Sequence, residues 1–271
     1  MLFQTLDNKN ECAAIYTDGE LLYDNFPQGL SKTWSYSNFL KEHQDVDYAY
    51  LYCGKSVEEV CPDSYRDSYE ISAGKLKAFL RSFGLSKISL NDNCFFDMVP
   101  ERFLLEYCEL KNKITDYVLE NYEKPENYDF LVDLAKVLEE IKCQKLDIDH
   151  TVLRTESHRL KTRQFMNKIR NIEPYIKYNI FGTKTGRLTT RKGTFPILTL
   201  DKQHRCVLKP TNDWFVELDF NAAELRTMLA LSGQKQPQED IHEWNIKNVF
   251  KENITRDEAK TRIFAWLYGS E

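Results

Sequence analysis

The segment from Asn212 to Gly233 constrains the fold more than any other, because its hydrophobic period changes within it. Its first half alternates with period two, which predicts a strand with one apolar face: Trp214, Val216, Leu218 and Phe220. From Ala222 the apolar residues recur at helical spacing, and Gly233 supplies a stop. Asp219 is thus expected where a strand feeds into a helix. A carboxylate there can hold a hard cation, although a simple turn residue explains the spacing equally well.

Charge is distributed unevenly along the chain. Residues 151–210 contain 14 Lys and Arg against three acidic residues, a balance of +11. Because the whole chain carries −5, the remainder carries −16. A basic block in an acidic chain is typical of a surface that binds a polyanion such as nucleic acid. The alternative is a solvated helix face.

The 271 residues leave room for two domains. No apolar run approaches the ~20 residues of a membrane span, and no basic-then-apolar leader begins the chain, so we expect no membrane partner and a cytoplasmic location. The seven cysteines are scattered without a Cys-x-x-Cys pair, which indicates reduced thiols and no structural zinc.

The first 95 residues predict a small α/β unit, in which Asp18-Gly19 closes a hairpin. The expected strands are 12–17, 21–26, 48–53 and 87–90, with helical patterns at 36–43 and 72–83. Asp18 and Glu20 also have the Asp-x-Glu spacing that begins the metal site of proofreading exonucleases. The turn is the favoured interpretation, and a reduced, inactive relative of such a domain is left open.

Two amphipathic helices are expected next. Pro100 predicts a helix from Glu101, with an apolar stripe formed by Phe103, Tyr107, Leu110, Ile114 and Val118. After a break at 123–125, a second helix carries Phe130, Leu134, Val137, Leu138 and Ile141. A basic helical stretch follows at 149–171. A segment rich in Thr, Gly, Lys and Arg then predicts contacts to a nucleic-acid backbone, from Lys184, Thr185, Arg187, Arg191 and Lys192. A basic hairpin with unspecific contacts is the alternative.

The last helix begins with a capping box, Thr255 to Glu258. Its cations and aromatics recur every four residues and share one face: Arg256, Lys260, Phe264 and Tyr268. Two cations and two aromatic rings in one stripe suit a nucleoside triphosphate, and Ile263, Trp266 and Leu267 are expected to pack underneath. Taken alone, this helix is equally an ordinary basic amphipathic helix.

Three of these segments resemble the family A DNA polymerases, the bacterial DNA polymerase I group. Asp219-Phe-Asn-Ala-Ala-Glu-Leu-Arg226 resembles motif A, and Thr185-Gly-Arg-Leu188 resembles the start of the palm. Arg256-x3-Lys-x3-Phe-x3-Tyr-Gly269 resembles motif B, and Asp240-Ile-His242 resembles the segment before it. They occur in the family's order. The resemblance covers 174–271 well, the preceding helices loosely and the first hundred residues hardly at all.

We expect an α+β protein. The residue pattern gives it a small α/β N-terminal domain (1–98), and the resemblance implies a helical thumb (99–172), the start of an antiparallel palm with motif A (173–233) and the first fingers helices with motif B (234–271). It implies a template-directed DNA polymerase, a nucleotidyltransferase that extends a primer 3′-hydroxyl on primer–template DNA with dNTPs. Two Mg²⁺ ions would act in the complete site.

The same resemblance implies roles for individual residues. Asp219 would bind metal and act with Lys260 in catalysis. Arg256 and Lys260 would neutralise the leaving pyrophosphate, and Arg187 would contact the minor groove at the primer terminus. The dNTP would contact Glu224, His242, Arg256, Lys260, Phe264 and Tyr268. Glu224 would exclude a 2′-hydroxyl, and it also sits where it could cap its own helix together with Asn221.

The family's motif C, a His-Asp-Glu segment with the second metal carboxylate, has no counterpart, since no His-Asp pair occurs in the sequence. We therefore expect the N-terminal part of a polymerase, with a separate C-terminal fragment carrying motif C as its partner. A split enzyme, a gene interrupted at motif B and a truncated chain are all left open. The alternative function is a non-catalytic DNA-binding module on a polymerase-derived scaffold.

Overall fold

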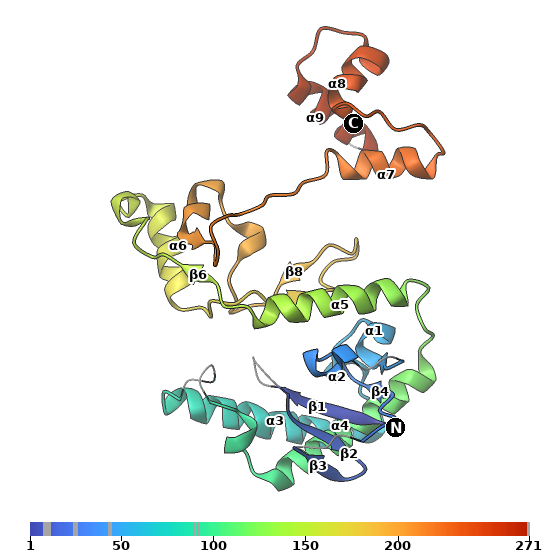
Figure 1. Ribbon diagram of the computed structural model, residues 1–271, viewed down its shortest axis with the longest axis vertical. Helices are drawn as coiled ribbons and strands as arrows, with labels where there is room; N and C mark the ends of the chain where they lie inside the picture. Colours follow the sequence, from blue (N-terminus) through green and yellow to red (C-terminus); the bar gives the residue numbers. More distant parts are fainter. Residues whose placement is uncertain (8–11, 24–26, 43–44, 89, 91–92, 270–271) are drawn as a thin grey trace. The chain divides into compact units, whose positions relative to one another are not determined.

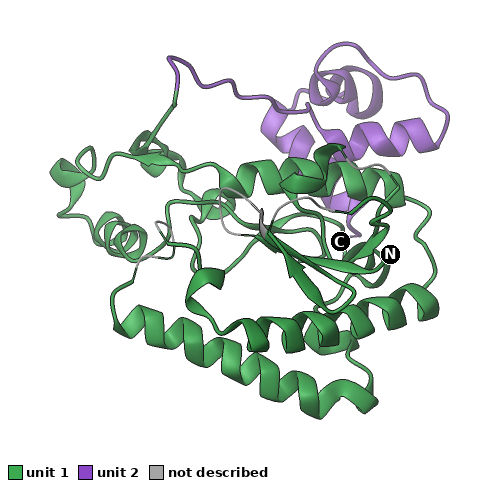
Figure 2. Ribbon diagram, turned by 60° about the horizontal axis from the view of Figure 1, so that its bottom comes forward, with its two compact units in different colours: residues 1–211 green, residues 212–271 purple. Residues whose placement is uncertain are grey.

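A computed structural model describes residues 1–7, 12–23, 27–42, 45–88, 90 and 93–269. The chain divides into two compact units, residues 1–211 and 212–271 (Figure 2). The mixed α+β class is confirmed. The finer layout of thumb, palm and fingers stays a prediction. None of the helices in the described ranges is both long and apolar enough to cross a membrane.

Unit 1 begins with an antiparallel sheet of order β1-β2-β3. Its strands are β1 (Phe3–Asp7), β2 (Cys12–Thr17) and β3 (Glu20–Leu22). The predicted strand 12–17 is confirmed, and Thr17 pairs with Glu20 across the predicted hairpin. Asp18 and Gly19 both have positive φ angles, 48° and 86°, as the tight hairpin turn requires. The second predicted strand is shorter than expected, and residues 24–26 lie outside the described residues.

Helix α4 (Glu101–Asn121) anchors the sheet and begins directly after Pro100, as predicted. The buried Gln4 amide of β1 donates to Asn112 Oδ1 (2.9 Å) and Thr115 Oγ1 (3.1 Å). Tyr16 donates to Glu109 at 2.6 Å. The long helix α3 (Asp63–Leu85) contains the predicted helical segment 72–83 and contributes phenylalanines to the core shared by α4 and the sheet. The N-terminal sheet, α3 and α4 thus share one core, although α4 was predicted to belong to a separate helical region.

Two predicted strands are wrong, and one predicted helix is a 3₁₀ helix, η1 (Asn38–Glu42). Residues 48–53 form the end of β5 (Asp47–Tyr48), which pairs in parallel with β4 (Lys32–Thr33), and then helix α1 (Ala49–Cys53). A short apolar run does not distinguish a buried strand from a buried helix, and Gly54 ends this one as a left-handed cap at φ 62°. The described residues of 87–90 follow the end of α3 as a turn.

Helix α5 (Tyr128–Cys143) lies between the N-terminal elements and the later hairpin (Figure 1). It follows α2 (Val57–Val60), η2 (Phe96–Met98) and α4 in the chain. Its buried residues are Tyr128, Leu131 and Leu138, whereas Phe130 is 65% exposed. The buried face of α5 is therefore rotated about the helix axis relative to the predicted one: it includes Leu131, which the sequence pattern did not single out, and excludes Phe130.

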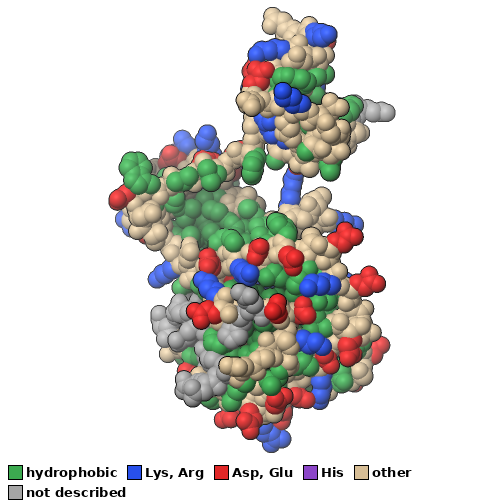
Figure 3. All heavy atoms as spheres, turned by 45° about the vertical axis from the view of Figure 1, so that its right-hand side comes forward, with side chains coloured by type: hydrophobic (Ala, Val, Ile, Leu, Met, Phe, Trp, Pro, Cys, Tyr) green, Lys and Arg blue, Asp and Glu red, His purple; other side chains and the backbone are tan. Residues whose placement is uncertain are grey.

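The basic segment folds around its own core of Leu153, Met166, Ile169, Phe195 and Val207. Its elements are η3 (Arg154–Glu156), α6 (Leu160–Arg170), η4 (Ile197–Thr199) and η5 (Lys202–Val207), with two short antiparallel pairs, β6 (Asp147–Ile148) with β9 (Leu208–Lys209) and β7 (Tyr178–Asn179) with β8 (Thr189–Thr190). On the face in Figure 3, most acidic side chains lie over the N-terminal part of unit 1, in line with the charge asymmetry.

Unit 2 contains helix α7 (Ala223–Leu231), helix α8 (Ile241–Asn245), a π-helical turn η6 (Ile246–Phe250) and helix α9 (Arg256–Leu267). They share a small core of Leu225, Ile241 and Ile263. The predicted stop at Gly233 is confirmed by its φ of 66°.

The predicted strand over 214–220 is wrong. The segment has no strand assignment, and its four apolar side chains are 80–89% exposed: Trp214, Val216, Leu218 and Phe220. A strand needs neighbours that satisfy its backbone hydrogen-bonding groups. Among the described residues of unit 2 no strand is present to supply them.

Candidate nucleotide site in unit 2

The first turn of α9 is fixed by its own side chains. Thr255 Oγ1 accepts from the Glu258 backbone N–H at 3.3 Å, and Glu258 Oε2 accepts from the Thr255 N–H at 2.8 Å. The predicted capping box is confirmed. Because the box fixes where the helix begins, it also fixes the positions of Arg256 and Lys260 along it.

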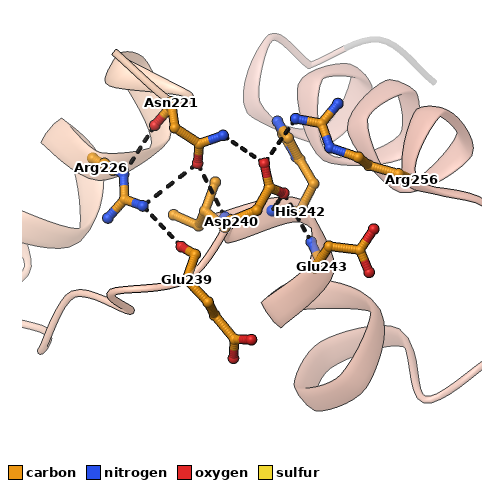
Figure 4. A network of polar contacts seen from close by, with 8 residues as sticks. Asn221, Arg226, Glu239, Asp240, His242, Glu243 and Arg256 are labelled. Carbon is orange, nitrogen blue, oxygen red and sulfur yellow. Dashed lines mark hydrogen bonds and ion pairs between the residues drawn. The ribbon is translucent and has the colours of Figure 1, made fainter.

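Asp240 connects three segments of the unit (Figure 4). Its Oδ1 caps α8 by accepting from the backbone N–H groups of His242 (2.9 Å) and Glu243 (3.1 Å). Its Oδ2 accepts from Asn221 Nδ2 at 2.6 Å and from Arg256 at 2.8 Å. The Arg256 guanidinium, more than the other donors, holds the pKa of Asp240 well below its usual range. The motif A-like, Asp-Ile-His and motif B-like segments therefore meet at one carboxylate.

Arg226 is a structural residue that sequence reasoning missed. Its guanidinium donates to the backbone carbonyls of Asn221 (2.9 Å), Pro237 (2.8 Å) and Glu239 (3.0 Å). It thereby holds the loop before α8 against the start of α7 (Figure 4). One signal in the sequence could have indicated this role. Arg226 follows Glu224 by two residues, roughly 200° around the helix, so its side chain lies on a different face of α7 from Glu224.

Glu224 contacts the motif B-like helix rather than capping its own. Its carboxylate accepts a short hydrogen bond from the hydroxyl of Tyr268, the C-cap residue of α9. The expected capping by Asn221 and Glu224 is wrong, because the Asn221 side chain is engaged by Asp240 and by the Ile241 N–H. Ala222, at φ 51°, instead precedes the helix without a side-chain cap.

Three rings lie in a row beside these charges. Phe264 packs against His242, with centroids 6.1 Å apart, and stacks on Tyr268 at 6.0 Å and 13°. His242 is buried, and its Nδ1 has no hydrogen-bond partner in the described part of the chain. Burial, with the nearby positive charges of Arg256 and Lys260, lowers the pKa of His242 despite Asp240. The ring is therefore neutral at neutral pH.

Lys260 is exposed and forms no ion pair with any described residue. Ile263 packs underneath α9 as predicted, whereas Trp266 is 65% exposed. The helix thus presents a free ammonium group beside the row of rings, next to an arginine that already has an anionic partner.

Asp219 lies in the exposed segment before α7. No group of three or more His, Cys, Asp or Glu side chains that could hold a metal ion gathers among the described residues. Asp219 is an oxygen ligand of the type that Mg²⁺ prefers, but alone it does not form a metal site. A pair of metal ions needs carboxylates beyond this one.

The predicted DNA-contacting residues lie in unit 1, on the β7–β8 hairpin and just after it. All of them are exposed: Lys184, Thr185, Arg187, Arg191 and Lys192. The turn is held by Thr183 Oγ1, which donates to the Arg187 carbonyl at 3.0 Å, and by the positive φ of Gly186, 74°. Lys184, Thr185 and Arg187 therefore lie within or at the end of this turn, whereas Arg191 and Lys192 follow β8.

Scans against protein-family models, curated proteins and solved structures returned no significant match.

Proposed function

We propose that the chain is the N-terminal part or subunit of a family A DNA polymerase, which extends a primer 3′-hydroxyl with dNTPs. The observation that carries the proposal is the Asp240 network. The segment that resembles motif A ends at Arg226, and the segment that resembles motif B begins 30 residues later at Arg256. Both donate to the Asp240 carboxylate, the first through Asn221 and the second through Arg256. A chance likeness in unrelated segments gives no reason for them to meet.

The hydrogen bond between Glu224 and Tyr268 is a second observation that supports a dNTP-binding site in unit 2. The resemblance gives both residues to the dNTP pocket, and they form a hydrogen bond with each other. A glutamate held in this way is positioned, which is what exclusion of a 2′-hydroxyl needs.

The proposed chemistry of α9 follows from its side chains. Lys260 supplies an unpaired positive charge for phosphate oxygens, and Arg256 supplies a guanidinium fork already oriented by Asp240. The ring of Phe264 offers a face to the base and sugar. Neutral His242 contributes a hydrogen-bonding nitrogen rather than a charge. Together these groups would bind the triphosphate and stabilise the charge that develops on pyrophosphate.

The remaining metal carboxylate is proposed to come from a C-terminal part that carries motif C. The exposed apolar segment before α7 supports such a partner, because four large apolar side chains in a segment outside any strand offer a surface for strand addition: Trp214, Val216, Leu218 and Phe220. Mg²⁺, when bound there, would supply Lewis-acid activation of the phosphate.

The test is dNTP binding by the purified chain in the presence of primer–template DNA. Lys260→Ala should weaken binding by roughly tenfold or more, since a charge-assisted phosphate contact is lost. Arg262→Ala is the matched control, because Arg262 lies on the same helix and is engaged with Glu252. Equal dNTP affinity in both variants and wild type would refute the site.

A second arm separates the polymerase from a DNA-binding module. The chain alone is expected to bind primer–template DNA without extending it. Addition of a C-terminal part carrying motif C should restore Mg²⁺-dependent incorporation, and Asp219→Asn should abolish it. DNA binding with no dNTP binding and no restored incorporation would instead establish the non-catalytic module.

A further inference from the structure

Unit 1 contains a cleft of about 800 Å³ that has no role in the proposed nucleotide site. Its lining comes mainly from residues 34–36, the α1–α2 region, helix α5, and the β7–β8 hairpin with the two residues after it. The volume lies in the upper part of the range for ligand-binding clefts, roughly 300–1,000 Å³. All of its lining residues belong to residues 1–211, so it is independent of unit 2.

The hairpin is fixed against α1 by specific contacts. The hydroxyl of Tyr50 donates to Asn179 Oδ1 at 3.1 Å, and the Tyr50 ring meets Phe181 edge-on at 5.3 Å. Gly54 brings the end of α1 so close that an added Cβ would lie 3.2 Å from the Phe181 ring. These contacts hold the hairpin against the end of α1.

Basic side chains outnumber acidic ones in the lining, five to three. Lys142 and Lys177 are paired with Glu139 and Glu173. Lys55, between α1 and α2, and Lys192, just after β8, form no ion pair within the described ranges, and Arg191 contacts Tyr50. The nearby Glu59 carboxylate is held in the capping box of α2, 2.8 Å from the Ser56 N–H. Five basic against three acidic side chains leave the lining with a net charge of +2.

One lining residue carries a buried donor without a partner among the described residues. Tyr36 is 7% exposed, lines the cleft, and its hydroxyl has no hydrogen-bond partner among the described residues. Burial raises the pKa of Tyr36, so the hydroxyl keeps its proton. Leaving a buried donor unpaired is unfavourable. A ligand with an acceptor oxygen or base nitrogen would pair it.

We propose that this cleft binds a short stretch of single-stranded nucleic acid. Phosphates would meet Lys55 and Lys192, and bases would stack on the partly exposed rings of Tyr50 and Phe181. Two cations contributed by separate parts of the lining suit successive phosphates of a polymer better than the single phosphate group of a free nucleotide. A duplex keeps its base faces stacked and offers none to these rings. Tyr36 would donate to a base or phosphate.

Fluorescence anisotropy with a labelled oligothymidylate of about eight nucleotides, within the site sizes of single-strand-binding folds, tests the proposal. The double variant Lys55→Ala/Lys192→Ala should raise the Kd roughly tenfold or more and flatten the slope of log Kd against log salt by about 1.4, since each phosphate contact contributes about 0.7. Lys75→Ala/Lys77→Ala on the exposed face of α3 is the matched control and should leave both quantities unchanged.

Tyr36→Phe keeps the ring and removes only the hydroxyl, so it should preserve the thermal unfolding midpoint and raise the Kd roughly threefold to tenfold. Competition with thymidine triphosphate and with inorganic phosphate identifies the ligand. Displacement of the oligonucleotide by either at similar concentration would overturn the single-strand proposal in favour of a free-nucleotide or phosphate site. Unchanged affinity in both cleft variants would overturn the site itself. Lys260→Ala should not affect this binding, so the result is independent of the dNTP test.

Discussion

Replacement of Asp240 tests whether the network that joins the segments of unit 2 holds them together. Asp240→Ala removes the cap of α8, worth about 1 kcal/mol, and the hydrogen bond from Asn221 to a charged acceptor, worth about 1.5 kcal/mol. The expected loss is about 2–3 kcal/mol of the free energy of unfolding of unit 2. For a unit of about 60 residues this lowers the unfolding midpoint by roughly 10–20 °C.

Asp240→Asn separates the contributions, because asparagine caps a helix nearly as well as aspartate. It retains the cap through Oδ1, but the amide nitrogen in place of Oδ2 cannot accept from Asn221 or Arg256, so only the share of the cap, about 1 kcal/mol, should remain. Glu243→Gln is the control, since only the backbone N–H of Glu243 bonds to Asp240 and the substitution leaves that bond in place. Hydrogen exchange of the α7–α9 amides, read by mass spectrometry, reports on unit 2 separately from unit 1. Wild-type protection in Asp240→Ala would refute the reasoning.

Three further predictions concern the sugar selectivity of Glu224, the acid sensitivity of Asp240 and the salt dependence of DNA binding at Lys184. In the complete enzyme, Glu224→Ala should reduce discrimination against ribonucleotides by roughly 10–100-fold in single-nucleotide kinetics; an unchanged preference would leave Glu224 with only its contact to Tyr268. Because the pKa of Asp240 is depressed in the fold, its stabilisation is present above about pH 4, the ordinary carboxyl range, and is lost as pH falls further; exchange in α8 should rise in that acid window for wild type and less so for Asp240→Asn. Lys184→Ala on the hairpin should reduce the salt slope of duplex binding by about 1, and an unchanged slope would place the phosphate contacts elsewhere.

The sequence predicted elements whose signals are local. The hairpin at Asp18-Gly19, the helix start after Pro100 and the capping box at Thr255 each depend on a few adjacent residues, and each is confirmed. The strand at 48–53 was wrong because a short apolar run fits a buried helix equally well. The strand predicted over 214–220 was wrong because a strand also depends on neighbouring strands, and the alternation of apolar residues within one segment does not show whether such neighbours exist.

In the candidate site too, features that depend on neighbouring residues in the sequence were predicted, and contacts between distant residues were not. The spacing of Arg256, Lys260, Phe264 and Tyr268 could be read from one helix, since intervals of four share a face. The bonds from Asp240 to Asn221 and Arg256 could not, because they join positions 16 to 19 residues apart. Arg226 was missed for a related reason: its shortest hydrogen bonds go to backbone carbonyls, which leave no trace in side-chain patterns.

Photo-crosslinking of a radiolabelled dNTP to the chain, followed by peptide mapping, tests the central claim most directly. The claim is that α9 binds a nucleoside triphosphate through Lys260 and the row of rings at Phe264. The crosslink should map to residues 256–268, remain in Arg262→Ala and fall sharply in Lys260→Ala. A crosslink confined to unit 1, or one of equal yield in Lys260→Ala and wild type, would contradict the assignment.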